Sequence, residues 1–286
     1  MTSLAQDCGM PLTTLPSKRL MRYKNNVGVT VNIKSLNMNK LTILNFTNVY
    51  SEETFYKHER TTWIDCTDIA GTDCLCDSDA TTAICDKIKD IPPHGIHFID
   101  SGNYHYVSKF FTDKIDTKFV LTVFDHHTDM QPSLFEGLLT CGSWIKDVID
   151  TNKYLEKVVL IGTSDKLLEQ VDKTYLPKLV EFKESQLCNK TAWDDFAKLH
   201  FNYPIYISID KDVLDPDVEV TNWDQGATTI QQLKKLLSIL LTHDKLIGID
   251  ICGECNYSIK GLLDDNLRKD DTVNRLLLKL CEKEIK

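Results

Sequence analysis

Residues 121–131, LTVFDHHTDMQ, place two carboxylates and two imidazoles at the end of a run of apolar and β-branched residues. Burying such ionisable side chains is costly unless an ion partner or a metal compensates their charge. In an extended segment, side chains two residues apart point the same way. Asp125, His127 and Asp129 are therefore expected to converge, while His126 points away. The stretch predicts a buried strand that delivers three ionisable side chains to one site.

A second segment, SIDKDVLDP at residues 208–216, repeats this arrangement with Asp210 and Asp212. Further polar side chains follow three more strand-like runs: His105 after residues 95–100, Asp165 after residues 157–164, and Glu254 after residues 245–251. In open α/β sheets, ligands bind beyond the carboxyl ends of the strands. These side chains are therefore predicted to lie in one crevice.

The rest of the chain alternates between strand-like and helix-like runs. The strand-like runs are residues 41–50, 95–100, 118–125, 157–164, 204–210 and 245–251. The helix-like runs are residues 78–91, 105–115, 142–151, 191–200, 228–244 and 271–285. This alternation predicts an α/β fold with three layers, in which helices cover both faces of a mainly parallel sheet. We expect residues 1–286 to form a single domain, with the irregular first 60 residues as an extension at its edge.

The composition is that of an ordinary globular protein, with 42% hydrophobic and 26% charged residues. No run of residues is apolar enough to span a membrane, and the N-terminus lacks the apolar core of a signal peptide. A cytoplasmic location is therefore expected. The formal net charge of -9 argues against a nucleic-acid partner, which would favour a basic face.

The chain contains 10 cysteines. In a long chain without an export signal, reduced thiols are expected rather than a disulfide framework. Four cysteines crowd one segment, and a zinc site there stays open although the spacing differs from that of zinc ribbons: Cys66, Cys74, Cys76 and Cys85. Cys252 and Cys255 have the spacing of a redox pair, but no helix begins between them. The sequence does not assign these cysteines a role.

Several carboxylates and imidazoles in one crevice repel one another and lose hydration unless cations lie among them. Their mixture suits a divalent first-row metal, Mn²⁺ first, with Zn²⁺, Fe²⁺ and Co²⁺ as alternatives. Two metals bridged by a carboxylate can hold a hydroxide at neutral pH and stabilise charge on the attacked centre. A single aspartate is more often a helix cap or a loop residue. Two such motifs, each at the end of an apolar strand, favour the metal site.

These motifs resemble those of the ureohydrolase superfamily, which includes arginase, agmatinase and formimidoylglutamase. GNYH (102–105), DHHTD (125–129) and SIDKDVLDP (208–216) fall in the family's order, and GIDICGE (248–254) follows them. The resemblance covers about residues 95–256, and the strand pattern extends it to most of the chain. It implies an arginase-like fold, a small-molecule substrate and hydrolysis of a C–N bond in a guanidino, amidino or related compound. The oligomeric state stays open, a homo-oligomer included.

The resemblance also implies two manganese ions and a hydroxide that bridges them and attacks the substrate carbon. Asp129 would orient this hydroxide and carry a proton to the leaving amine, and Glu254 would pair with the cationic group of the substrate. Asp125 and Asp210 would bridge the ions. The first ion would bind His105, Asp125, Asp129 and Asp210, and the second Asp125, His127, Asp210 and Asp212.

The chain departs from the family pattern at four points. GNYH replaces Gly-Gly-Asp-His, and His126 stands where the family has a small residue. Gly253 is inserted before Glu254, and Cys141 replaces a histidine. These departures predict a retained metal site and an altered substrate site, so efficient cleavage of arginine is not expected. The candidate substrate-binding residues are Gln131, Cys141, Asp165 and Trp223.

Two other functions remain open. The DHH triplet after an apolar strand also occurs in manganese-dependent DHH phosphoesterases, although FIDSGNYH lacks the paired aspartates of their early motif. A non-catalytic protein on the ureohydrolase fold, which binds metal or a metabolite, is the other alternative. The replaced histidine and the displaced Glu254 favour the binding protein, and the full metal set favours the enzyme.

Overall fold

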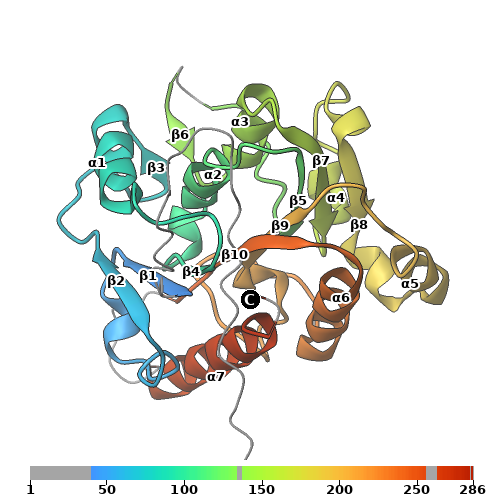
Figure 1. The fold of residues 1–286 in the computed structure, drawn as a ribbon. Helices are drawn as coiled ribbons and strands as arrows, with labels where there is room; N and C mark the ends of the chain where they lie inside the picture. The colour runs from blue at the N-terminus through green and yellow to red at the C-terminus, as the bar shows by residue number, and fades with distance from the viewer. Residues whose placement is uncertain (1–39, 134–136, 256–262, 284, 286) are drawn as a thin grey trace, which may run out of the picture. The chain divides into compact units, whose positions relative to one another are not determined.

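The computed structural model describes residues 40–133, 137–255, 263–283 and 285, and these are built around a central sheet of eight strands. The strand order is β2-β1-β4-β10-β9-β5-β7-β8, and every neighbouring pair is parallel (Figure 1). The strands are β1 Leu41–Asn45, β2 Thr61–Asp65, β4 Ile96–Phe98, β5 Phe119–Phe124, β7 Leu155–Ile161, β8 Leu179–Phe182, β9 Ile205–Asp210 and β10 Leu246–Cys252. A separate antiparallel pair joins β3 Leu75–Cys76 to β6 Leu139–Thr140.

Helices cover both faces of this sheet, and each face has its own hydrophobic core. One core includes side chains of α5 Lys190–Phe196, α6 Ile230–His243 and α7 Leu263–Cys281. The opposite core includes side chains of α1 Ser78–Ile88, α2 Val107–Thr112, α3 Trp144–Thr151 and α4 Asp165–Leu168. The predicted α/β architecture with three layers and a mainly parallel sheet is therefore confirmed (Figure 1).

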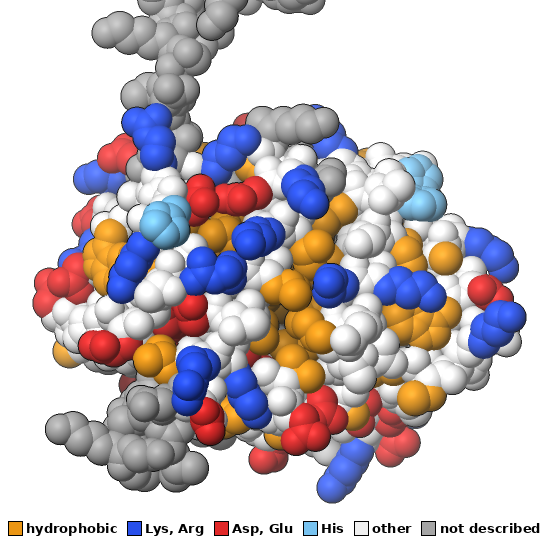
Figure 2. Space-filling model, turned by 90° about the horizontal axis from the view of Figure 1, so that it is seen from below, with side chains coloured by type: hydrophobic (Ala, Val, Ile, Leu, Met, Phe, Trp, Pro, Cys, Tyr) orange, Lys and Arg blue, Asp and Glu red, His pale blue; other side chains and the backbone are white. Residues whose placement is uncertain are grey.

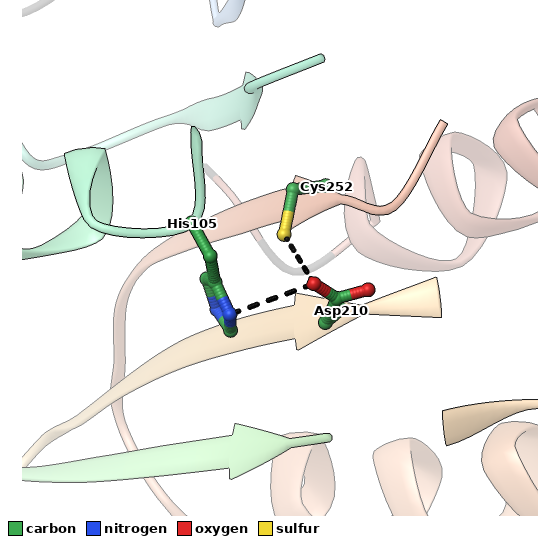
Figure 3. Close-up of side chains that lie close together, drawn as sticks. All are labelled: His105, Asp210 and Cys252. Atoms are coloured by element: carbon green, nitrogen blue, oxygen red, sulfur yellow. Dashed lines mark hydrogen bonds and ion pairs between the residues drawn. The ribbon is translucent and has the colours of Figure 1, made fainter. Parts of the chain in front are cut away.

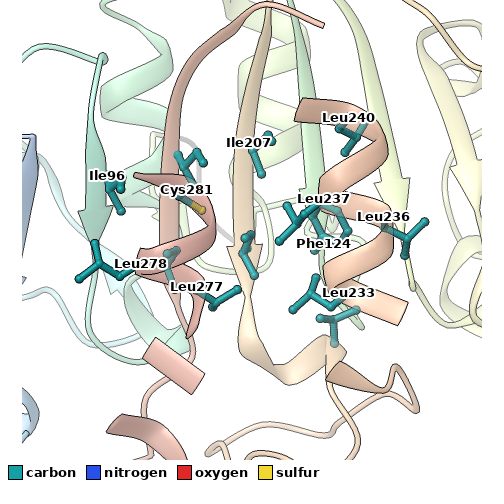
Figure 4. Close-up of a cluster of buried hydrophobic side chains, with 14 of the residues drawn as sticks. Ile96, Phe124, Ile207, Leu233, Leu236, Leu237, Leu240, Leu277, Leu278 and Cys281 are labelled. Carbon is teal, nitrogen blue, oxygen red and sulfur yellow. The ribbon is translucent and has the colours of Figure 1, made fainter. Parts of the chain in front are cut away.

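Helix α6 shows how the sequence pattern produces this packing. Thr229 caps its first turn by accepting a hydrogen bond from the Gln232 backbone N–H, and Gln232 bonds back to Thr229. The buried leucines of one helix face belong to the same hydrophobic core as Phe124 and Ile207 of the sheet, whereas Ile96 lies beside α7 (Figure 4). Each of these leucines is at most 2% exposed: Leu233, Leu236, Leu237 and Leu240. Truncating one of these leucines to alanine would cost about 2–5 kcal/mol.

The four central strands place the predicted site. β4, β10, β9 and β5 are neighbours in the sheet although their sequence positions are far apart. Because the strands are parallel, their carboxyl ends lie at one edge. This edge therefore brings together the loops that follow residues 98, 124, 210 and 252.

Several element boundaries differ from the sequence prediction. The strand predicted at residues 41–50 ends at Asn45, and α7 begins at Leu263, eight residues before residue 271. β2 and β8 were not predicted, and they form the two edges of the sheet. The expected edge extension concerns residues 1–60, most of which lie outside the described residues, so that extension and the single domain over residues 1–286 stay predictions.

The described residues give no sign of a membrane span, since none of their helices is both long and apolar enough to cross a bilayer. The cytoplasmic location stays a prediction. Figure 2 shows the face covered by α6 and α7, where acidic and basic side chains mix around a band of hydrophobic ones. The absence of a nucleic-acid partner stays a prediction.

Candidate metal centre

A cavity of about 200 Å³ opens at the carboxyl edge of the sheet. Most of the side chains proposed from the sequence line it: Asp125, His127, Asp129, Gln131, Cys141, Asp210, Asp212 and Trp223. His105 is 1% exposed and contacts three of these carboxylates. The structure thus brings together all six side chains that the resemblance implies as metal ligands.

The segment after β5 forms a tight turn that holds three of the proposed metal ligands, Asp125, His127 and Asp129. The His127 backbone N–H donates to Asp125 Oδ1 at 2.6 Å, and the His127 ring Nδ1 lies 2.8 Å from Asp212 Oδ2. Asp129 has a φ of +48°, which is uncommon for a residue other than glycine and strains the backbone. The Trp144 indole N–H donates to Asp129 Oδ2 at 2.6 Å and fixes that carboxylate.

The segment after β9 is tied to the segment after β5. The Asp212 backbone N–H donates to Asp210 Oδ1 at 2.9 Å, and the His126 backbone N–H donates to Asp212 Oδ1 at 3.0 Å. The His126 ring instead faces Glu184, with Nδ1 and Oε2 3.2 Å apart. The turn after β5 and the 3-10 turn Lys211–Val213 after β9 thus aim Asp210, Asp212 and His127 at the site and His126 away from it, although neither segment is extended as the sequence analysis expected.

The surroundings of the two ring nitrogens of His105 show whether these residues suit a bound cation. Its Nδ1 is buried and has no hydrogen-bond partner, yet it lies 3.2 Å from Asp125 Oδ2 and 3.0 Å from Asp129 Oδ2. Its Nε2 lies 2.8 Å from the Ser208 hydroxyl. Metal-binding histidines usually donate their second ring N–H to such a partner, which leaves the other nitrogen as the ligand. The residues therefore fit a divalent cation.

The charges of the site point the same way. Burial and the neighbouring Asp212 raise the pKa of Asp210 to about 7, and burial and Asp125 raise that of Asp212 to about 6. Burial works against the charged form of His127, but hydrogen bonds to Asp125 and Asp212 raise its pKa to about 12. Without a cation, Asp210 is therefore partly protonated at neutral pH, and His127 carries a positive charge. A divalent cation would replace this positive charge.

Glu254 is a correction to the sequence prediction, because it does not line the cavity. It is fully buried, its Oε2 accepts from Lys211 Nζ at 2.8 Å, and its Oε1 accepts from Asn274 at 2.9 Å. The inserted Gly253 has a φ of +99° and turns the chain after β10. Both carboxylate oxygens are therefore engaged within the protein, and we do not retain Glu254 as a substrate-binding residue.

Lys211 is the centre of this second cluster. It lies between Asp210 and Asp212, points to the opposite side, and is 0% exposed. Its ammonium group also lies 3.0 Å from Glu219 and 3.1 Å from Asp270. Three carboxylates thus surround one buried lysine, whose charge takes the place that a cation would have there.

Asp165 is a second correction. It is the first residue of α4, and its carboxylate accepts two hydrogen bonds from Ser185, one from the backbone N–H and one from the hydroxyl. It does not line the cavity, whereas Leu167 of the same helix does. Asp165 therefore holds the α4 loop and is not retained as a substrate-binding residue.

Trp223 lies at the wall of the cavity and is 39% exposed. Its indole N–H donates to Asn103 at 2.8 Å, and its ring packs edge-on against His127 at 5.8 Å between centroids. Gly102 makes this approach possible, because a Cβ there would lie 2.8 Å from Asp210 Oδ2 and 3.0 Å from Trp223. This residue of the GNYH segment thus serves close packing beside the metal ligands.

Two residues of the centre were missed by sequence reasoning. Trp144, which fixes Asp129, gives no signal because it reads as an ordinary apolar residue at a helix start. Cys252 ends β10 and lies 3.2 Å from Asp210 Oδ2. Cys252 ends an apolar strand, as Asp210 does, and this position in the sequence could have indicated that it belongs to the site. Burial and the neighbouring Asp210 raise the pKa of Cys252 well above its usual value.

The cysteines of residues 66–85 do not form the zinc site that was left open. All four are free thiols: Cys66, Cys74, Cys76 and Cys85. Within the described part of the chain, none of them belongs to a group of side chains that could hold a metal ion. Burial raises the pKa of Cys66 to about 12, so this thiol remains protonated at neutral pH.

The parallel sheet of eight strands, with carboxylates and histidines gathered at its carboxyl edge, defines the class as an arginase-like α/β protein. The sequence model of the arginase family matches residues 40–256, which is more than half of the chain. The chain therefore belongs to the arginase family. A Thermotoga maritima protein, described only as uncharacterized, is 34% identical over 165 residues. That match spans 57% of this chain and 60% of the relative.

Solved structures show the same fold at low sequence identity. An arginase from Medicago truncatula has a TM-score of 0.61 and 15% identity over 87% of this chain and 90% of the other. A Bacillus cereus arginase also has a TM-score of 0.61, with 11% sequence identity. The match covers 85% of this chain and 98% of the other. Proclavaminate amidino hydrolase from Streptomyces clavuligerus has a TM-score of 0.57 and 14% sequence identity. The match covers 85% of this chain and 92% of the other. The comparisons give no support to a DHH phosphoesterase.

Proposed function

We propose that this protein hydrolyses a C–N bond of a small guanidino, amidino or related cationic compound. The site is proposed to hold two divalent cations, and Mn²⁺ is the expected ion. One observation carries the proposal. Four aspartates and two histidines of an arginase-family chain converge on one cavity, and the buried Nδ1 of His105 has no hydrogen-bond partner there.

The proposed ligands divide into two overlapping sets. One ion is assigned to His105, Asp125, Asp129 and Asp210, and the other to Asp125, His127, Asp210 and Asp212. Asp125 and Asp210 are shared. When bound, such a pair of ions lowers the pKa of a water molecule and stabilises negative charge on the attacked carbon.

The chain itself would orient the substrate and move the proton. Trp144 and the strained backbone hold the Asp129 carboxylate in one position, from which it is proposed to protonate the leaving nitrogen. Trp223 and Gln131 line the cavity and are proposed to contact the substrate. A volume of about 200 Å³ suits a small compound.

Arginine is not expected to be the preferred substrate. Cys141 lines the cavity where the family's arginases carry a histidine, and burial and the neighbouring Asp129 raise the pKa of its thiol. A protonated thiol is a poor substitute for a proton-carrying imidazole. Glu254, the acid expected to pair with the substrate cation, is instead bonded to Lys211.

The test combines a metal count with a substrate panel. Metal-free protein is loaded with Mn²⁺, its metal content is measured by mass spectrometry, and release of urea or ammonia is assayed. The panel contains arginine, agmatine, guanidinobutyrate, formiminoglutamate and related amides. The proposal expects two ions per chain and turnover of a compound other than arginine. Arginine as the best substrate, with kcat/KM of roughly 10⁴ M⁻¹s⁻¹ or more, would contradict the substrate assignment.

His127→Ala should lower both metal content and turnover. Asp195→Asn is a matched control, because this acid is exposed and pairs only with the nearby Lys198 at 3.6 Å. Full metal occupancy in His127→Ala would refute the ligand set. The same experiments separate the second candidate, a binding protein, which the engagement of Glu254 by Lys211 favours. Two bound ions without turnover of any compound would support that candidate.

A further inference from the structure

The thiol of Cys252 has no role in the proposed function, yet it lies inside the metal centre. Cys252 is the last residue of β10 and is 1% exposed. Its Sγ lies 3.2 Å from Asp210 Oδ2 and points toward that carboxylate (Figure 3). Asp210 is one of the two aspartates proposed to bridge the ions.

Three donors of different chemistry converge at this point. The ligand atoms of His105, Asp210 and Cys252 all lie within 4.8 Å of one another. They come from three segments of the sheet edge, and Figure 3 shows all three side chains pointing toward a common centre. The His105 Nδ1, which lies 3.6 Å from Asp210 Oδ2, is buried and has no hydrogen-bond partner. This unpartnered nitrogen indicates that a ligand belongs beside the histidine, and the Cys252 sulfur lies within 4.8 Å of it.

The backbone is shaped to present this sulfur. Gly253 has a φ of +99°, and a Cβ there would lie 2.6 Å from Asp210 Oδ1. Only glycine can make this turn so close to Asp210. The turn at Gly253 directs Glu254 to Lys211. It also leaves Cys252, at the end of β10, beside Asp210.

We propose that Cys252 is a direct ligand of one of the two metal ions and makes that position selective for a softer cation, Zn²⁺, Co²⁺ or Fe²⁺, over Mn²⁺. This inference rests on the proposed function, since it needs the metal centre to be real. Thiolate ligands select such ions, whereas oxygen ligands suit manganese. Binding exchanges the thiol proton for the cation and releases that proton to solvent.

The two metal positions then differ in kind. The group formed by Asp125, His127 and Asp212 contains no sulfur, whereas the group formed with His105 and Asp210 does. Cys141 also lines the cavity, but among the described residues it belongs to no group of side chains that could hold a metal. It therefore provides a matched control for the sulfur of Cys252.

The test uses the full chain, stripped with a chelator and loaded with Co²⁺. A sulfur-to-cobalt charge-transfer band in the near ultraviolet is expected in the unaltered protein and in Cys141→Ser, and its loss is expected in Cys252→Ser. Direct titration should show that Cys252→Ser lowers the affinity for Zn²⁺ by about 100-fold or more, since even indirect partners of a metal site contribute about 10–100-fold. The affinity for Mn²⁺ should change much less.

A second measurement avoids the variant, in case Cys252→Ser does not fold. X-ray absorption at the zinc edge of the unaltered protein should show a sulfur neighbour at about 2.3 Å. Two bound ions without a charge-transfer band, or without a sulfur neighbour, would overturn this inference and leave the proposed function intact. Failure to bind any divalent ion would overturn both.

Discussion

Replacing Lys211 by methionine is expected to destabilise the protein strongly, and more at alkaline than at acidic pH. The ammonium group is fully buried and lies within 3.1 Å of Glu219, Glu254 and Asp270. Glu53 is the fourth acid that acts on it. Methionine has a similar length and no charge, so the substitution leaves the carboxylates in place without their cation.

The magnitude follows from burial. Removing one partner of a buried ion pair costs about 3–5 kcal/mol, because the remaining charge is uncompensated. For a chain of this size, that loss lowers Tm by roughly 10 °C. The unfolded chain exposes all these groups to water and gains nothing from Lys211. The whole difference therefore appears in the free energy of unfolding.

The pH dependence has a definite sign. Burial raises the pKa of Glu219 to about 7 from 4.5, and that of Asp270 to about 6 from 3.8. A group whose pKa is raised on folding contributes stability below its unfolded pKa, and this is lost as pH rises through the folded pKa. Lys211 lowers both pKa values, so its loss moves them further up. The variant should therefore be closest to the unaltered protein near pH 5 and furthest from it near pH 8.

The assay is urea unfolding followed by tryptophan fluorescence at pH 5 and pH 8, with a chelator present so that metal binding does not contribute. Lys118→Met is the control, because Lys118 pairs with Glu156 at 2.6 Å on the surface. Exposed pairs contribute little, so this variant should be nearly unchanged at both pH values. A loss in Lys211→Met no larger than in Lys118→Met, or one equal at both pH values, would refute the reasoning.

Three further predictions concern the metal centre. Asp210→Asn should lose more bound metal than His105→Ala in a mass-spectrometric count, because Asp210 is proposed to serve both ions; equal and mild losses would contradict bridging. Trp144→Phe should weaken metal binding by about 10–100-fold in a direct titration, because Asp129 loses its indole N–H partner. An unchanged affinity would mean that Trp144 contributes to packing but does not position Asp129. Asp165→Asn should keep both metal content and turnover. A drop in turnover would show that Asp165 does contribute to substrate binding.

The sheet, and the gathering of carboxylates and histidines at the ends of its strands, could be predicted because the sequence shows continuous apolar runs that end in ionisable residues. Continuous apolar runs mark strands that are covered on both faces, as in β5 and β9. The expected convergence of Asp125, His127 and Asp129 is observed, but a turn with a positive φ at Asp129 produces it rather than the alternation of an extended segment. The edge strands β2 and β8 lack the strand signal. They are short and largely half-buried or exposed, and a charged residue stands in each of them, TTWID and LVEF, so neither forms a continuous apolar run.

Other features depend on contacts that no local pattern encodes. The fate of Glu254 is decided by Lys211, which lies 43 residues earlier in the chain. The role of Asp165 is decided by Ser185, which lies 20 residues later. Cys252 was overlooked because its neighbours Gly253 and Glu254 matched the end of a family motif. The structure places Cys252 beside Asp210 and directs Glu254 to Lys211, and the sequence pattern contains no signal for either contact.

The position of β10 has a consequence for how the chain matures. Among the described strands, β10 comes last in sequence, but it lies between β4 and β9. The loop after β4 carries His105, and β9 ends with Asp210. During synthesis, these two strands must wait with open edges until residues 246–252 have left the ribosome. The sheet edge that carries the proposed metal ligands is therefore complete only once β10 has paired with both of these strands. A chain that stops before residue 246 would expose two central strand edges and is expected to aggregate during translation.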